Sequence, residues 1–236
     1  MFDFGHIWPW IGLGAAGLLL FLLTTNALRS DRAVSRWRDM VWLTWAAVFA
    51  YLLHQFEEHG IDAEGRAYAF RGFLCAQLGF ADPASCPVPV AFITTVNIAA
   101  VWIAGPLSAV LAGRWPVVGL SFFAIPAGNL FAHLIPAALS QSYNPGLLTA
   151  LALFLPLSLI AFAAAMTRYH LGVRAVLASL FAGAVLHAIL MGSLVSFVNG
   201  RLGLDELLIV QVANPLLAVV LVVILSGRRV VRRFAT

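Results

Sequence analysis

Four ionisable side chains end one apolar run of the chain, in the stretch AYLLHQFEEHG at residues 50–60. On a helix, which turns about 100° per residue, His54 and Glu58 are four residues apart and lie on one face. Glu57 is three residues from His54 and flanks that face. An imidazole and a carboxylate at a four-residue spacing can bind one metal ion, as the histidines of an HExxH motif do. The three-residue pair has the spacing of the Glu-x-x-His pairs of di-iron bundles, in reversed order.

Histidines of two later apolar runs extend this candidate site. His133 follows Asn129 by four residues in GNLFAHLIP, and His187 stands in AVLHAIL. We predict four metal ligands and one catalytic base, which are His54, Glu58, His133 and His187 as ligands and Glu57 as the base. Three histidines and a carboxylate suit zinc and a metal-activated water, and a second glutamate also allows a di-iron site.

A purely structural reading of the same residues stays open. An ionised side chain inside a bilayer costs roughly 2.5–3.5 kcal/mol, so two carboxylates need compensation. A metal ion would supply it, and so would hydrogen bonds among Glu, His and Asn side chains with one glutamate protonated. If the helix ends early, Glu58 and His59 instead lie at the membrane surface, where they cost little.

The composition requires a membrane around these residues. The chain of 236 residues is 62% hydrophobic and 10% charged, with a mean hydropathy of +0.95, whereas soluble domains carry about 25% charged residues. All fourteen basic residues are arginine, and the lack of lysine excludes a retinal pigment, which needs a lysine Schiff base. The basic pI of about 9.7 reflects arginines in the loops between apolar runs, so we expect no nucleic-acid partner.

The apolar runs predict an all-α bundle in one integral membrane domain, residues 1–236. A bilayer core of about 30 Å needs roughly 20 apolar residues per helix. Seven runs meet this length, at about 7–27, 40–59, 89–111, 116–139, 147–167, 173–198 and 206–226. Eleven arginines lie on one side of this arrangement, including the tail residues Arg228, Arg229, Arg232 and Arg233. The positive-inside rule therefore predicts an external N-terminus and a cytoplasmic C-terminus.

Polar residues of five or six predicted helices then fall at one depth, in the outer half of the membrane, while the inner halves are almost entirely apolar. We expect these residues to support the site by hydrogen bonds, alongside the ligands and the base. The supporting set is His59, Asn97, Asn129, Gln211 and Asn214. His59 is equally explained as a helix C-terminal residue favoured by the helix dipole.

Two features lie outside the predicted helices on the same outer side. Cys75 and Cys86 are the only cysteines, and an oxidising compartment would allow a disulfide between them, although two separate thiols remain possible. The segment SYNPG at 142–146 is a turn signal. Its Tyr143 could line the entrance to the site.

The string His54-Gln55-Phe56-Glu57-Glu58 fits H-x-x-E-E, and the chain resembles the bacterial membrane-protein family named for this HXXEE motif. The resemblance extends to the chain length, the several spans, and later Asn and His positions in apolar helices, here Asn129 and His133. It supports the choice of His54, Glu57 and Glu58 and implies no particular reaction.

These observations lead to one principal hypothesis and two alternatives. The principal one is a metal-dependent enzyme of the bacterial plasma membrane, using zinc or iron on a lipid or amphiphile at the outer leaflet. A transporter or proton-coupled carrier could use the same Glu and His residues, but a path across the membrane would need polar residues in the inner halves too. A structural protein with a polar packing cluster is the third hypothesis.

Overall fold

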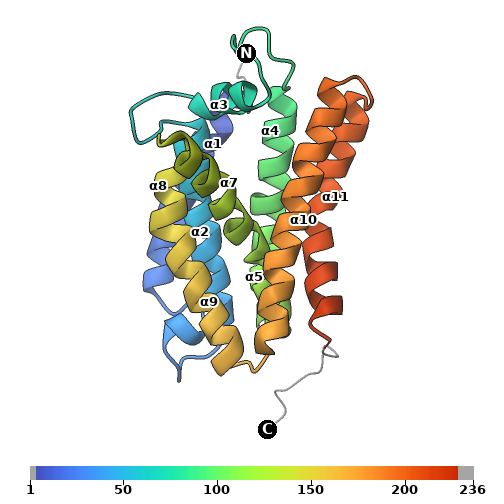
Figure 1. The fold of residues 1–236 in the computed structure, drawn as a ribbon. Coiled ribbons are helices and arrows are strands. Elements are labelled where there is room, and N and C mark those ends of the chain that lie inside the picture. Colours follow the sequence, from blue (N-terminus) through green and yellow to red (C-terminus); the bar gives the residue numbers. More distant parts are fainter. Residues whose placement is uncertain (1–3, 228–236) are drawn as a thin grey trace.

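The apolar runs of the sequence form a bundle of long helices that run up and down between two ends (Figure 1). The computed structural model describes residues 4–227. Its α-helices are α1 (Phe4–Thr24), α2 (Met40–His59), α3 (Ala69–Gln77), α4 (Val90–Asn97), α5 (Gly105–Ala112), α6 (Pro116–Phe122), α7 (Ala124–Ser140), α8 (Leu147–Thr149), α9 (Leu155–Thr167), α10 (Gly172–Val198) and α11 (Leu204–Leu225). The described part of the chain has no β-strand, only an isolated bridge between Ile61 and Ala67.

Six helical stretches within residues 4–227 are long and apolar enough to cross a membrane, and they indicate an integral membrane protein. They are Phe4–Thr24, Val90–Ala112, Pro116–Ser140, Leu147–Thr167, Gly172–Val198 and Leu204–Leu225. Six of the seven predicted spans are thereby confirmed as candidate spans, with ends shifted by a few residues. The predicted span 40–59 is the helix α2, which has the length but is not among the six, because its last two turns carry the polar stretch His54 to His59.

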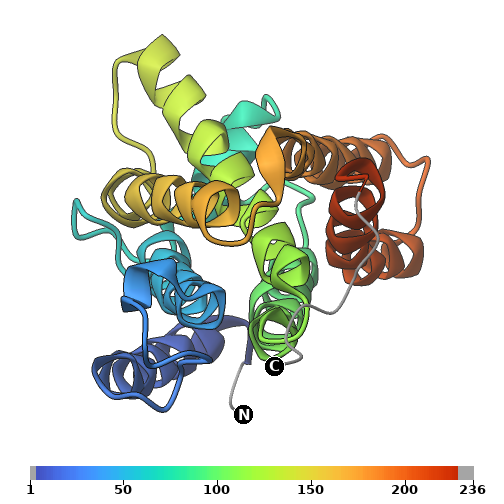
Figure 2. The same ribbon diagram turned by 90° about the horizontal axis from the view of Figure 1, so that it is seen from below.

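Helix α2 lies inside the bundle rather than at its surface. It packs against α1, α5, α6 and α9, and Figure 2 shows it between α1 and α9. Its buried residues include Met40, Leu43 and Ala50 toward the start and His54 and Glu58 toward the end. Because protein surrounds this helix, polar side chains on it are kept away from lipid, which is where buried polar groups of membrane proteins are tolerated.

Two of the spanning helices contain π-helical turns that the sequence did not predict. Segment η2 (Ile98–Ala104) joins α4 to α5, and η3 (Ala150–Phe154) joins α8 to α9. Each begins directly after a polar residue of the candidate site, Asn97 in the first case and Thr149 in the second. Such turns occur mostly at functional sites, because they redirect side chains without ending the helix.

The segment between α2 and α4 covers one end of the bundle, which we call the disulfide end (Figure 1). It contains α3 and a disulfide between Cys75 and Cys86. Arg71 on α3 also holds this segment, because its guanidinium donates to the backbone oxygens of Val88 at 3.0 Å, Pro83 at 3.0 Å and Cys86 at 2.8 Å. Helix α3 is thus anchored above the bundle at two points.

The opposite end, which we call the arginine end, contains the short helix η1 (Arg36–Arg38) and the α9–α10 turn. Here Asp39 caps α2 by accepting from the backbone N–H of Val41 at 3.0 Å, and Arg168 pairs with Asp31 at 2.8 Å. The tail arginines, from Arg228 onward, lie outside the described residues. Which end faces the cytoplasm stays a prediction.

Candidate metal-binding site

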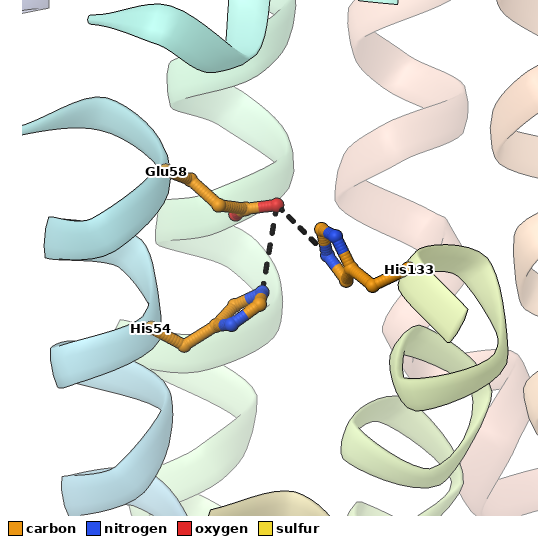
Figure 3. Close-up of side chains that lie close together, drawn as sticks. All are labelled: His54, Glu58 and His133. Carbon is orange, nitrogen blue, oxygen red and sulfur yellow. Dashed lines mark ion pairs between the residues drawn. The ribbon is translucent and has the colours of Figure 1, made fainter. Parts of the chain in front are cut away.

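Three predicted ligands meet near the disulfide end of the bundle (Figure 3). Glu58 projects from α2 between the rings of His54, one turn earlier on the same helix, and His133 on α7. Its Oε1 atom lies 3.4 Å from His54 Nε2 and 3.2 Å from His133 Nε2. One ligand atom from each residue lies within 4.8 Å of the others. The exposed fractions of His54, Glu58 and His133 are 0%, 5% and 2%, so the cluster is closed off from solvent.

The hydrogen bonds of Asn144 determine which nitrogen of His133 carries the proton. Asn144 Nδ2 donates to the backbone oxygen of His133 at 3.0 Å, which leaves its Oδ1 facing His133 Nδ1 at 2.7 Å. Since an amide oxygen only accepts, Nδ1 of His133 must be the donor. The neutral ring therefore presents a lone pair at Nε2, which has no hydrogen-bond partner and faces Glu58.

The tautomer of His54 follows from Glu57 in the same way. The Glu57 carboxylate accepts a short hydrogen bond from the Thr149 hydroxyl. This hydroxyl has no second proton to donate. Thr149 Oγ1 must then accept from His54 Nδ1, which lies 2.8 Å away. A second hydrogen bond supports this assignment, because Asn129 Nδ2 donates to His54 Nε2 at 2.9 Å. The single lone pair at His54 Nε2 therefore accepts from Asn129, and a metal ion bound there would take the place of this hydrogen bond.

Glu57 itself lies beside the cluster and is saturated by donors. Besides the Thr149 hydroxyl, it accepts from the Tyr143 hydroxyl at 2.7 Å and from the backbone N–H groups of Leu148 at 3.0 Å and Thr149 at 2.8 Å. Partial burial raises the pKa of Tyr143 above its ordinary value of 10.0, and the hydrogen bond to Glu57 acts in the same direction. The phenol therefore stays protonated and remains a donor to Glu57.

Two imidazole lone pairs and a carboxylate oxygen thus converge in a buried space. The unpartnered lone pair of His133 and the Glu58 carboxylate repel each other unless a proton or a cation lies between them. Imidazole nitrogen and carboxylate oxygen are common ligands of divalent zinc and iron. The described residues His54, Glu58 and His133 can therefore hold a metal ion.

The turn at 142–146 is part of this site, which its sequence did not reveal. Gly146 has a φ of +97°, and a methyl group there would lie 2.6 Å from His133 Cε1 and 2.7 Å from His54 Cε1. Only glycine fits, both for its backbone and for its lack of a side chain. Together with Asn144 and Thr149, Gly146 is a site residue that the analysis of the sequence missed. The one available signal was that the turn SYNPG falls on the same side of the membrane as the polar cluster.

Two of the predicted supporting residues lie on the side of the other oxygen of Glu58, one in contact with it and one behind. His59 Nε2 lies 3.4 Å from Glu58 Oε2, and Asn97 Nδ2 lies 3.3 Å from the same nitrogen of His59. Asn97 is held in turn by Gln55, which donates to its Oδ1 at 3.0 Å. Trp102 completes this chain by donating to Gln55 Oε1 at 3.0 Å.

The remaining polar residues meet the cluster across a cavity of about 670 Å³. The residues that line it include Tyr51, Glu58, His59, Asn97, Asn129 and His133, together with His187 of α10 and Gln211 and Asn214 of α11. The single depth predicted from the sequence is thus realised as one cavity. His187 is not part of the group of ligand atoms, and its Nδ1 lies 2.9 Å from the backbone oxygen of Gly183 on its own helix.

Residues 45–161 include the metal-ligand cluster together with Tyr51, Glu57, Asn97, Asn129, Asn144 and Thr149. No curated protein and no solved structure matches the chain. Residues 45–161 match the family model described as a protein of unknown function with HXXEE motif, which confirms the resemblance predicted from His54, Glu57 and Glu58.

Proposed function

We propose that this protein is a metal-dependent membrane enzyme whose metal ion is held by His54, Glu58 and His133. The observation that carries the proposal is the convergence of three acceptors. The Nε2 lone pairs of both histidines face Glu58 Oε1, at 3.4 and 3.2 Å. With both rings neutral, no ring proton points into this space, and a cation that replaced the Asn129 hydrogen bond at His54 would be shared by all three groups.

The donor set fits the metals that such ligands hold. Two histidines and one carboxylate are the protein ligands of several zinc hydrolases and of non-haem iron oxygenases, and both kinds of site keep a position open for the reaction. When bound, such a metal polarises a carbonyl or phosphoryl oxygen and lowers the pKa of a bound water. Glu58 and His133 line the cavity, so the open position would face it.

We assign Glu57 a positioning role in place of the catalytic base that the sequence suggested. All its contacts are with donors of the 143–149 segment, and the Thr149 hydroxyl connects it to His54 Nδ1. A carboxylate behind a ligand histidine fixes the tautomer and the orientation of the ring. Through Thr149, Glu57 would keep the Nε2 lone pair of His54 directed toward the metal.

The cavity favours a lipid or another amphiphile as substrate. Helices α7 and α10 cross at Gly128 and Gly183, where a methyl group at Gly128 would lie only 2.7 Å from His187 Nδ1. Beyond this crossing, cavity-lining side chains of α7 reach the bundle surface, with Phe131 49% and Ile135 54% exposed. An opening flanked by such residues would admit an alkyl chain from the bilayer.

The orientation predicted from the arginines places this opening in the outer leaflet. The site and the disulfide are at the same end of the bundle, and disulfides persist in oxidising compartments such as the periplasm. Arginines of the loops gather at the other end, which the positive-inside rule assigns to the cytoplasm. The proposal thus includes α2 as a seventh span, an external disulfide end, and a bacterial plasma-membrane location.

Metal content of the detergent-purified protein tests the proposal. Mass spectrometry after growth with zinc or iron should find near-stoichiometric metal in the wild type and a loss of most of it in His54→Ala and Glu58→Ala. Two histidine variants serve as matched controls: His187→Ala and His170→Ala, the latter at an exposed site near the arginine end, should both keep the metal. A metal-free wild type, even after reconstitution with either metal, would contradict the proposal.

A further inference from the structure

The part of the cavity lining that α10 and α11 contribute carries its own set of oriented polar groups. Gln211 and Asn214 lie one turn apart on α11, and both are nearly completely buried, with 1% and 9% exposure. His187 on α10 lies beside them along the same cavity. We call these three residues the acceptor wall.

Hydrogen bonds determine which atom each side chain of the acceptor wall presents. Ser193 gives its hydroxyl proton to the backbone oxygen of Leu190 at 3.0 Å, so its Oγ accepts from Gln211 Nε2 at 2.8 Å. Asn214 Nδ2 donates to the backbone oxygen of Leu186 at 3.0 Å. Each of these amide nitrogens thus donates one of its two protons, whereas neither amide oxygen accepts a hydrogen bond.

Three groups of this wall are acceptors. Gln211 Oε1 and Asn214 Oδ1 are buried and have no hydrogen-bond partner. His187 Nδ1 lies 2.9 Å from the backbone oxygen of Gly183, to which it must donate, so the neutral ring presents a lone pair at Nε2. A buried acceptor without a donor destabilises the protein, because its hydrogen bond to water is lost and not replaced. Two such oxygens on one cavity wall indicate a ligand that brings donors.

We propose that the acceptor wall binds the hydroxyl groups of a neutral amphiphile, such as a long-chain alcohol or a glyceryl ether, whose alkyl chain leaves toward the lipid. This inference rests on the proposed function, because it names the class of substrate that the metal site would receive. The residues of α10 and α11 that line the cavity include no charged side chain. A carboxylate or phosphate headgroup would repel the acceptor oxygens, and an ammonium group would find no counter-charge on this wall.

Competition binding with non-hydrolysable ligands of equal chain length tests the inference. The protein in lipid nanodiscs would bind radiolabelled dodecyl glyceryl ether, which has two free hydroxyls, and competitors would be dodecyl methyl ether and dodecylamine. Loss of one hydrogen bond weakens binding about three- to tenfold. We expect the glyceryl ether to bind at least this much more tightly than either competitor.

Variants then assign that preference to the acceptor wall. Gln211→Met and Asn214→Leu remove the oxygens at nearly constant volume and should abolish the preference for hydroxyls while the methyl ether still binds. Gln141→Met makes the same change at an exposed site outside the cavity and should leave the preference intact. Equal binding of all ligands to the wild type, tighter binding of dodecylamine, or a preference that survives in both cavity variants would overturn the inference. If a variant fails to fold, the relative affinities of the three ligands for the wild type still test the preference for hydroxyl groups.

Measurements on metal-loaded and chelator-treated protein separate this inference from the proposed function. A hydroxyl preference in protein that never binds metal would support the acceptor wall and contradict the metal-dependent enzyme. A metal-binding protein without any hydroxyl preference would support the metal site and overturn the acceptor wall.

Discussion

His133 Nε2 faces Glu58 Oε1 at 3.2 Å, while Asn144 holds the opposite nitrogen of the same ring at 2.7 Å. This relationship decides the chemistry of the cluster. Asn144 receives the only ring proton of neutral His133, so the nitrogen that meets the carboxylate is a lone pair. A metal ion is the partner that both groups can share.

Removing the Asn144 side chain should weaken metal binding without removing a ligand. Asn144→Leu frees the His133 ring to rotate or to change tautomer, and partners of this kind contribute about 10–100-fold to metal affinity. Titration with a fluorescent zinc indicator measures the loss. Asn199→Leu, at an exposed position between α10 and α11, should leave the affinity unchanged. Unchanged affinity in Asn144→Leu would show that Asn144 does not orient the ring.

Gly146→Ala should disrupt the cluster far more than an equivalent change elsewhere. Gly146 and Gly200 both have positive φ, +97° and +70°, but only Gly146 has side chains against the added methyl group. Gly200→Ala should therefore lower the free energy of unfolding only by the strain of a left-handed backbone at alanine, about 1–2 kcal/mol. Gly146→Ala must in addition displace His54 and His133, so we expect both a lower melting temperature than Gly200→Ala and a loss of metal. Equal thermal shifts, with metal retained in both, would contradict the close packing of Gly146.

Replacement of Glu57 distinguishes a positioning residue from a catalytic base. Glu57→Gln places an amide N–H₂ among donors and leaves buried groups unsatisfied, at roughly 1–3 kcal/mol each. We expect a lower melting temperature and weaker metal binding, and Thr149→Val should weaken metal binding in the same way by removing the acceptor of His54 Nδ1–H. A base would behave differently: Glu57→Gln would then keep stability and metal affinity and lose only turnover.

The loop after α2 should open in acid because of Asp62. Burial raises the pKa of this carboxyl, but hydrogen bonds from Arg66 and from the Glu64 backbone outweigh burial and hold the pKa below its ordinary value of 3.8. A lowered folded-state pKa gives stability that is complete above the unfolded value and is lost as pH falls through the folded value. The loss should therefore occur below about pH 4.

Hydrogen exchange of the amides at 62–66, followed from neutral pH to about pH 3, measures this opening. Asp62→Asn should open the loop already at neutral pH, whereas Glu64→Gln, which removes only an exposed ion pair with Arg66, should change little. Tyr143 should respond as well, because its hydroxyl accepts from the backbone of Ala63 at 3.1 Å. Protection factors at 62–66 that do not depend on pH in the wild type, after correction for the intrinsic exchange rate, would contradict the role of Asp62.

The helical bundle and the core of the site could be predicted because they depend on composition and local spacing. Apolar runs of membrane-spanning length are visible without tertiary information, and the four-residue spacing of His54 and Glu58 guarantees a shared face on any helix. The prediction that His133 joins His54 and Glu58 needed only one further assumption, that polar residues at the same depth in the membrane lie together. Helix α2 shows the limit of this argument. Its polar last turns lower its mean hydropathy, and only its burial among neighbouring helices makes such an end possible inside the bundle.

The supporting residues could not be predicted because they act through tertiary contacts. Asn144 and Gly146 stand in a turn whose composition is fully explained by turn formation, and nothing local shows that the turn folds back over α2. Thr149 lies at the start of a spanning helix, where a threonine is unremarkable until Glu57 is placed beside it. His187 illustrates the opposite case. It shares the predicted depth but is not among the grouped ligand atoms, and it lines a cavity that residues of α2, α3, α4, α7, α10 and α11 form together.

X-ray absorption spectroscopy of the metal-loaded protein tests the central claim most directly. If His54, Glu58 and His133 hold the metal, the zinc edge should show two imidazole ligands at about 2.0–2.1 Å and otherwise oxygen. The His187→Ala variant should give the same spectrum, and His133→Ala should lose one imidazole or the metal altogether. A spectrum without imidazole in the wild type, or one that changes with His187 and not with His133, would contradict the assignment of this site.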